Sequence, residues 1–208
     1  MEEKEHRVKP WLAYYDEGMP ASLDYPAVPL DQLLADAAAK HPDQPAIVFG
    51  GRVGGRILDQ ALTYRQLDQS VTQMAAGLQG LGVKPGDRVA IMMPNCPQFV
   101  ISFYGILRAG GIAVPCNFLY SAEEIQHQLS DAGAEVLLVL SAFYQKAHSV
   151  RARTPLRHII VTNVKEYFPT LLRLLFTVAK EKKEGHYTEL APGEDDYWFQ
   201  SLLSGARG

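Results

Sequence analysis

Four apolar runs decide the fold: RVAIMM at residues 88–93, IAV at 112–114, VLLVL at 136–140 and HIIV at 158–161. Helical segments of about three turns separate the first three runs, and a further helix is predicted between the last two. Continuous aliphatic strands that alternate with helices are typical of a parallel sheet that is covered on both faces. The sequence therefore predicts an α/β fold with a doubly wound, mainly parallel sheet and flanking helices.

Two capping boxes mark where helices of this core begin. Thr63 and Gln66 stand three residues apart ahead of a helical apolar pattern, and Ser121 and Glu124 repeat this arrangement further along the chain. In such a box the hydroxyl accepts from the backbone amide of the third residue, whose side chain accepts in return. We expect the first of these helices to end at Gly82 in a left-handed conformation.

The chain divides into three parts. Residues 1–28 carry no sustained period, which predicts an extended arm that lies on the body and buries four aromatic side chains, Trp11, Tyr14, Tyr15 and Tyr25. Residues 29–162 form the α/β core, which includes a small hairpin of strands 46–49 and 57–62. Residues 163–208 contain an apolar helix and a tail with apolar anchors, which are Tyr197, Trp198, Phe199, Leu202 and Leu203.

Composition and charge exclude several classes of protein. The 208 residues are 47% hydrophobic and 21% charged, which is typical of a globular chain. With 20 Lys and Arg against 23 Asp and Glu, the net charge of −3 argues against a nucleic-acid partner. The start of the chain resembles no signal peptide, and no apolar stretch approaches the roughly 20 residues that cross a bilayer. We expect a cytoplasmic protein whose two cysteines, Cys96 and Cys116, are buried thiols.

The signatures of catalysis are absent. The sequence contains no GxGxxG, GxxxxGK[ST], HExxH, CxxC or GxSxG motif, and its six histidines have no metal-ligand spacing. Cys96 follows the third predicted strand, where active-site residues often stand, but no partner base is identifiable. We therefore assign no catalytic, cofactor-binding or metal-binding residue.

One stretch suggests contact with lipid. Between Glu135 and Glu166 every charged residue is basic, and the apolar helix of residues 167–178 follows directly. A basic flank beside an apolar helix suits an anionic membrane or a carboxylate-bearing lipid, whereas a solvated face and a helix packed on the sheet would give the same pattern. The candidate lipid-facing or gating residues are Phe168, Leu171, Leu172, Leu175 and Phe176.

Three further segments carry a resemblance. These are LTYRQL at 62–67, GVKPGDRVAI at 82–91 and LRAGGIAVP at 107–115. In this order and spacing they resemble the opening of the AMP-forming acyl-CoA synthetase family, whose members form acyl-adenylates. The segments SLDYP at 22–26, HPDQPAI at 41–47 and PNCPQFV at 94–100 are similar to the bacterial long-chain fatty acid CoA ligases. Phe118 and Ser121 depart from that branch, which more often has proline and threonine there, so acyl chain length stays open.

The resemblance implies a two-step reaction. A fatty acid carboxylate attacks ATP to give acyl-adenylate and pyrophosphate, and coenzyme A then displaces AMP, with magnesium to spread phosphate charge. The family's phosphate loop, acidic motifs and catalytic lysine lie beyond the segments matched here. We therefore expect an N-terminal part of a longer enzyme, which is inactive by itself and binds no ATP, magnesium or coenzyme A.

Two alternatives remain open. The chain could be a standalone noncatalytic module that binds lipid or protein, or part of another adenylate-forming enzyme such as an aryl-CoA ligase or a peptide-synthetase domain. The expected partner is a fatty acid through the full-length enzyme, and peripheral contact with the inner face of the membrane and a homodimer are both compatible with the pattern.

Overall fold

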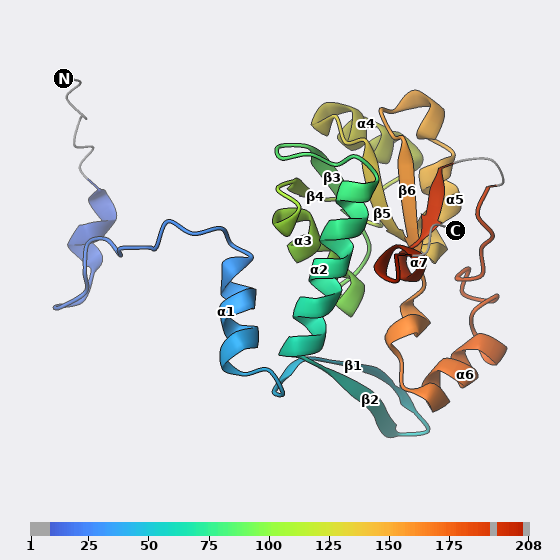
Figure 1. Cartoon of the computed structure of the whole chain (residues 1–208), viewed down its shortest axis with the longest axis horizontal. Helices are drawn as coiled ribbons and strands as arrows, with labels where there is room; N and C mark the ends of the chain where they lie inside the picture. The colour runs from blue at the N-terminus through green and yellow to red at the C-terminus, as the bar shows by residue number, and fades with distance from the viewer. Residues whose placement is uncertain (1–8, 192–194, 206–208) are drawn as a thin grey trace.

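The computed structural model describes residues 9–191 and 195–205. Its centre is a five-stranded parallel sheet in the order β4-β3-β5-β6-β7, beside a separate antiparallel hairpin of β1 and β2 (Figure 1). The strands of the described chain are β1 (Pro45–Val53), β2 (Arg56–Thr63), β3 (Arg88–Met92), β4 (Ile112–Pro115), β5 (Val136–Leu140), β6 (His158–Thr162) and β7 (Asp196–Trp198). The α-helices of the described chain are α1 (Gln32–Lys40), α2 (Tyr64–Gly80), α3 (Pro97–Arg108), α4 (Ala122–Ala132), α5 (Tyr144–His148), α6 (Thr170–Ala179) and α7 (Phe199–Leu203), and short 3-10 helices stand at Pro10–Tyr14, Ser141–Phe143, Arg151–Arg153 and Val164–Tyr167. The predicted α/β class with a mainly parallel sheet is confirmed.

Each central strand serves both faces of the sheet. Val89 and Ile91 of β3 pack with residues of α2, α3 and α7, whereas Ala90 and Met92 pack with residues of α4 and α5. Side chains alternate between the two faces of a strand, so an unbroken apolar run is buried only when both faces are covered. This double coverage is why the runs that predict the sheet contain so few polar residues.

Both predicted capping boxes are present. The Gln66 amide donates to Thr63 Oγ1 at 3.3 Å and the Thr63 amide donates to Gln66 Oε1 at 2.9 Å, which starts α2. Ser121 and Glu124 form the same pair of bonds at the start of α4. Gly82 has φ of +92°, a conformation that lets the chain turn from α2 toward β3.

The tail contributes a strand and a helix that the sequence does not predict. β7 pairs in parallel with β6, and Phe199 and Leu203 of α7 are buried in the core. Asp196 fixes this strand because its buried carboxylate accepts from Arg151 Nη1 and from the Tyr144 hydroxyl, each at 2.6 Å. The core therefore extends beyond the predicted boundary at residue 162.

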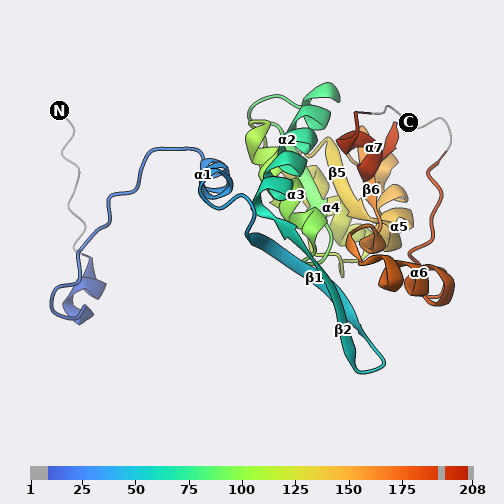
Figure 2. The same ribbon diagram turned by 60° about the horizontal axis from the view of Figure 1, so that its bottom comes forward.

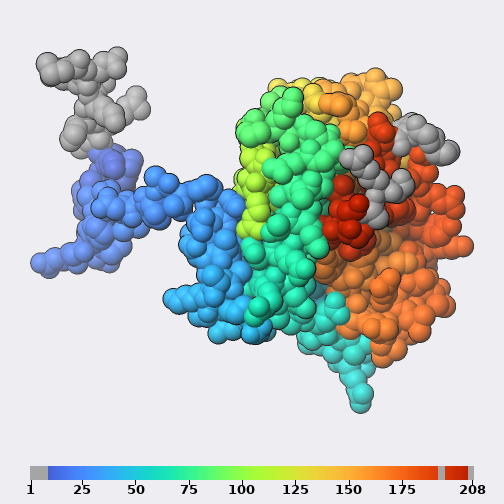
Figure 3. Space-filling view, viewed as in Figure 1, coloured from blue at the N-terminus to red at the C-terminus, as the bar shows by residue number. Residues whose placement is uncertain are grey.

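The predicted burial of the arm's aromatic side chains on the body is wrong where the structure describes the arm. The four aromatic side chains of the arm are between 45% and 88% exposed, and the arm stands away from the body (Figure 3). Backbone hydrogen bonds within the described part of this segment are local: the Leu12 amide donates to the Lys9 carbonyl and the Met19 amide donates to the Asp16 carbonyl. Aromatic side chains give a segment apolar surface that it can bury. They become buried only where the rest of the protein has a complementary apolar face.

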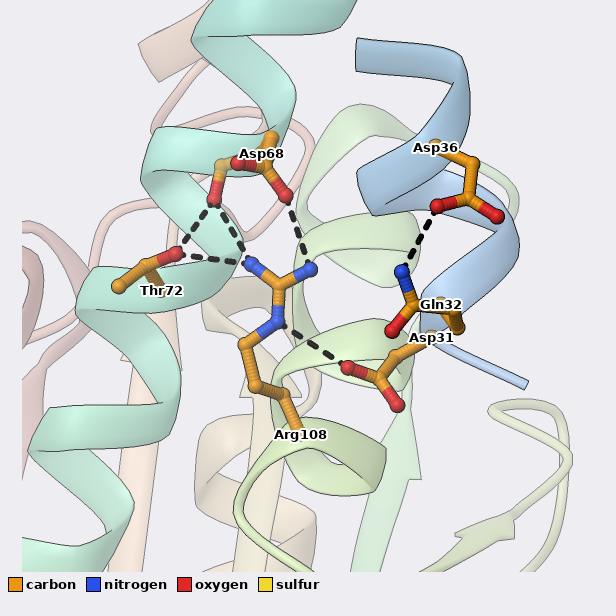
Figure 4. A network of polar contacts seen from close by, with 6 residues as sticks. All are labelled: Asp31, Gln32, Asp36, Asp68, Thr72 and Arg108. Carbon is orange, nitrogen blue, oxygen red and sulfur yellow. Dashed lines mark hydrogen bonds and ion pairs between the residues drawn. The ribbon is translucent and has the colours of Figure 1, made fainter. Parts of the chain in front are cut away.

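Arg108 joins three helices at the edge of the core (Figure 4). From α3 its Nε donates to Asp31 ahead of α1 at 3.2 Å, and its Nη2 lies 2.8 Å from the carboxylate of Asp68 on α2. Its Nη1 also donates to Thr72 Oγ1 at 2.8 Å. These contacts hold α1, and the chain leading into it, against α2 and α3.

Candidate groove at the carboxyl ends of the strands

A groove of about 660 Å³ lies where the central strands end. Its walls come from the hairpin, from α6 and from the residues that follow β3, β5 and β6; its lining includes Gly51, Arg52, Val53, Pro94, Leu140, Phe143, Val164, Phe168, Leu172, Leu175 and Phe176. Figure 2 shows the hairpin and α6 side by side below the sheet. Ligands of open α/β sheets bind outside the carboxyl ends of strands, and volumes of about 300–1,000 Å³ are typical of such sites. This groove is the candidate functional site.

Ring contacts position α6 against the hairpin. Phe168, just before α6, stacks on Phe49 of β1 with centroids 5.5 Å apart, and meets Phe176 of α6 edge to face at 5.6 Å. Phe176 in turn contacts the His186 ring at 5.3 Å. Leu172 packs over Gly51, where an added Cβ would lie 3.3 Å from its Cδ2. The helix therefore rests on the hairpin and not on a face of the five-stranded sheet.

The structure divides the five predicted lipid-facing residues between two environments. Leu172 and Phe176 are buried, Phe168 is half-buried, and Leu171 and Leu175 are exposed. All but Leu171 line the groove. The apolar helix thus has one face that the protein covers and another that it leaves open.

Sequence reasoning missed the opposite wall and the polar rim. The hairpin contributes Arg52, and the turn after α6 contributes Lys180, Glu184 and His186. Lys180 and Glu184 form an ion pair at 3.2 Å. The charged end of the helix is visible in the sequence, but the approach of a hairpin more than a hundred residues earlier in the chain has no local signal.

His186 has an apolar setting at this rim. Burial lowers its pKa, an effect that the nearby carboxylates of Glu184 and Glu181 partly oppose. Its buried Nδ1 has no hydrogen-bond partner among the described residues. The imidazole therefore acts at neutral pH as an uncharged ring that packs on Phe176.

Buried polar contacts hold the back of the groove. Asn163, directly after β6, donates through Nδ2 to Glu181 Oε1 at 2.9 Å and to the His186 carbonyl at 3.0 Å. Lys165 pairs with the other oxygen of Glu181 at 2.5 Å. Because these groups are shielded from water, their pairing fixes the segment after α6 to the end of β6.

Glu166 anchors the neighbouring turn. Its carboxylate accepts from Thr162 Oγ1 at 2.8 Å, from the Asn163 amide at 3.0 Å and from Gln200 Nε2 at 3.0 Å. Burial raises its pKa, although these donors act in the opposite direction. Burial also raises the pKa of the adjacent Tyr167 to about 12. We interpret the cluster as a structural link between β6 and α7.

Four of the five side chains in the predicted basic stretch are engaged with other groups of the chain. Lys146 donates to the carbonyls of Phe118 and Tyr120, and Arg157 pairs with Glu135. The remaining partners described above are Asp196 for Arg151 and Glu181 for Lys165. These side chains therefore stabilise local structure and do not form one basic face beside α6.

The two cysteines have no reactive geometry. Both thiols are free and buried, and burial raises the pKa of each to about 11. Within the described ranges, no three His, Cys, Asp or Glu side chains are arranged to hold a metal ion. No helix in that part of the chain has the length and apolar character to cross a membrane.

Comparison with known proteins identifies the family. The AMP-binding enzyme family matches residues 34–198, which span the hairpin, the sheet and the groove. The chain belongs to this family. It is 39% identical over 175 residues to a long-chain-fatty-acid–CoA ligase of Bacillus subtilis, a match that covers 84% of this chain and 30% of that protein. The resemblance to bacterial long-chain fatty acid CoA ligases is thereby confirmed.

Solved structures of the family share the fold. An anthranilate CoA ligase in complex with anthranoyl-AMP is 25% identical with a TM-score of 0.66, and the match covers 90% of this chain and 30% of that one. A long-chain-fatty-acid-CoA ligase from Archaeoglobus fulgidus is 27% identical with a TM-score of 0.62, covering 71% and 29%. The chain spans about 30% of the length of the relatives that it matches.

Proposed function

We propose that this chain is the N-terminal part of a long-chain fatty acid CoA ligase. The observation that carries the proposal is the 39% identity to the Bacillus subtilis enzyme over 84% of the chain. The anthranilate ligase, which has the same fold, is less similar in sequence at 25% identity. Within a family whose members differ in acid substrate, the closer sequence match favours the fatty acid.

The proposed reaction has two steps. A fatty acid carboxylate oxygen attacks the α-phosphorus of ATP, forming acyl-adenylate and expelling pyrophosphate. The sulfur of coenzyme A then attacks the acyl carbonyl, forming the thioester and expelling AMP. Together the steps convert fatty acid, ATP and coenzyme A into acyl-CoA, AMP and pyrophosphate.

We place the groups that carry out these steps outside this chain. The described residues offer no cluster of acidic side chains that fits Mg²⁺. The turns after β3, β5 and β6 carry Pro94, Ser141 and Asn163 and no glycine-rich loop that would cradle phosphates. The chain contributes scaffold, and its groove contributes an apolar surface for lipid.

Enzyme assays on two proteins test this proposal. The natural protein that contains this chain should release pyrophosphate from ATP with palmitate and form palmitoyl-CoA when coenzyme A is added. Residues 1–208 alone should give no turnover above a no-enzyme control. Turnover by residues 1–208 would refute the assignment of catalysis to other segments.

The choice of acid separates the remaining functions. Preference for benzoate or anthranilate over palmitate would indicate an aryl-CoA ligase, and preference for an amino acid would indicate a peptide-synthetase domain. A natural protein that binds palmitate but never consumes ATP would be a noncatalytic lipid-binding module. Each of these results would contradict the proposed fatty acid ligase.

A further inference from the structure

The outer face of α6 is an exposed apolar stripe. Leu171, Leu174, Leu175 and Val178 are 57%, 61%, 41% and 81% exposed. They stand at positions i, i+3, i+4 and i+7, which lie on one side of an α-helix. The helix therefore presents a continuous row of large aliphatic side chains to the outside.

This arrangement differs from that of an ordinary surface helix. Such a helix buries its apolar residues and turns polar residues toward water. In α6 the buried side chains are Leu172 and Phe176, so more large apolar residues are exposed than are buried. Contiguous apolar surface on a folded protein usually marks a binding surface.

Basic residues border the stripe. Between residues 170 and 185 stand four basic side chains, Arg173, Lys180, Lys182 and Lys183, against two carboxylates. One of the carboxylates, Glu181, is buried and forms an ion pair with Lys165. The other, Glu184, pairs with Lys180. The outward charge at this end of the helix is therefore positive.

Two neighbouring features extend the same surface. The Nζ of Lys182 lies 5.0 Å from the ring centroid of the exposed Tyr187, which places an aromatic ring and an ammonium group together beside the helix end. The hairpin tip carries Arg56 and projects on the same side of the molecule as α6 (Figure 2). Aliphatic side chains with Lys, Arg and Tyr at their edge are the composition of surfaces that lie at a lipid–water interface.

We propose that the stripe and its basic border dock the protein on the surface of an anionic bilayer. The four aliphatic side chains enter the acyl boundary, while the lysines remain at the level of the lipid phosphates. At about 1.5 Å per residue, the ten residues of α6 span about 15 Å, half of a hydrocarbon core, so the helix lies in the interface plane. Docking here also brings the groove beside the lipid, because Leu175 belongs to both surfaces.

Vesicle sedimentation with the natural protein tests the proposal without any substrate. The vesicles contain phosphatidylcholine alone or a mixture with phosphatidylglycerol. We expect wild type to bind the mixed vesicles and to be released at about 1 M salt, where the Debye length is about 3 Å. The double variant Leu174→Asp with Val178→Asp should bind at least about tenfold more weakly, as should Lys182→Glu with Lys183→Glu.

A matched control separates docking from misfolding. Leu33→Asp changes a leucine that is 54% exposed on α1, a helix far from α6 in Figure 1, and should leave vesicle binding unchanged. Circular dichroism and acyl-CoA formation in vesicle-free buffer should be the same for every variant. The binding readout needs no ATP, so a missing ligase activity refutes the proposed function and leaves this test intact.

Four results would overturn the proposal. Three of them are no binding of wild type to mixed vesicles, equal binding to both vesicle types, and undiminished binding of the aspartate variant. If the aspartate variant lost its fold, the stripe would be an interface that another part of the protein covers, which also contradicts docking on lipid.

Discussion

Replacing Asp196 by alanine should destabilise the chain by about 3 kcal/mol. The Asp196 side chain is 0% exposed and that of its partner Arg151 is 17% exposed. Removing one member of a buried ion pair costs about 3–5 kcal/mol. We expect the lower end of that range because Arg151 also donates to the Arg157 carbonyl. For a chain of this size the loss corresponds to a fall in Tm of about 6–12 °C.

Equilibrium urea unfolding measures this loss, and the fluorescence of Trp198 reports on it from the same strand. The control is Glu135→Ala, which breaks an ion pair whose side chains are 57% and 63% exposed and should cost less than about 1 kcal/mol. Asp196→Asn keeps an acceptor for the Tyr144 hydroxyl and should fall between the two. Equal losses for Asp196→Ala and Glu135→Ala, within about 0.5 kcal/mol, would refute the idea that this carboxylate fixes β7.

Three other changes test the core. A Cβ at Gly105 would lie 2.5 Å from Cγ and 2.8 Å from Cβ of the buried Met74. Gly105→Ala should therefore lower the free energy of unfolding in urea by about 1–3 kcal/mol. An unchanged unfolding midpoint would contradict the close approach of α2 and α3. Arg108→Ala should cost about 2–3 kcal/mol and speed tryptic cleavage around α1, whereas an unchanged cleavage rate would show that other contacts hold that helix. Burial raises the pKa of the Cys96 and Cys116 thiols to about 11, above the value of about 8.5 for an unfolded thiol. The contribution of the two thiols to stability is therefore complete below about pH 8.5 and is lost as pH rises toward about 11. At about pH 8 a thiol reagent should label them only in denaturant, and rapid labelling of the native chain would contradict their burial.

The central sheet was predictable because its signals are local. β5 and β6 are buried on both faces, so every side chain of VLLVL at 136–140 and HIIVT at 158–162 lies in the protein interior. The capping boxes at Thr63 and Ser121 depend on residues three positions apart, which the sequence displays directly. In these elements local propensity and tertiary burial favour the same structure.

The missed elements depend on contacts between distant residues. β7 is only three residues long and half-buried. It forms because its backbone pairs with β6 and because Asp196 forms an ion pair with Arg151. The groove likewise depends on the stacking of Phe49 of the hairpin on Phe168, and no local sequence pattern predicts that contact. In the N-terminal arm the aromatic content predicted burial, but the four aromatic side chains are exposed because the described chain has no apolar surface against them.

The two faces of α6 decide which substitutions are informative. Leu172 and Phe176 hold the helix on the hairpin and line the groove, so polar substitutions there are expected to cost stability through a buried, unpaired polar group. A loss of lipid binding or activity in such variants would then reflect the fold as much as the lipid. Leu174 and Val178 contribute little to packing, because most of each side chain is exposed. A change in vesicle binding caused by these two residues, with the core intact, would therefore report on the outer surface of the helix alone.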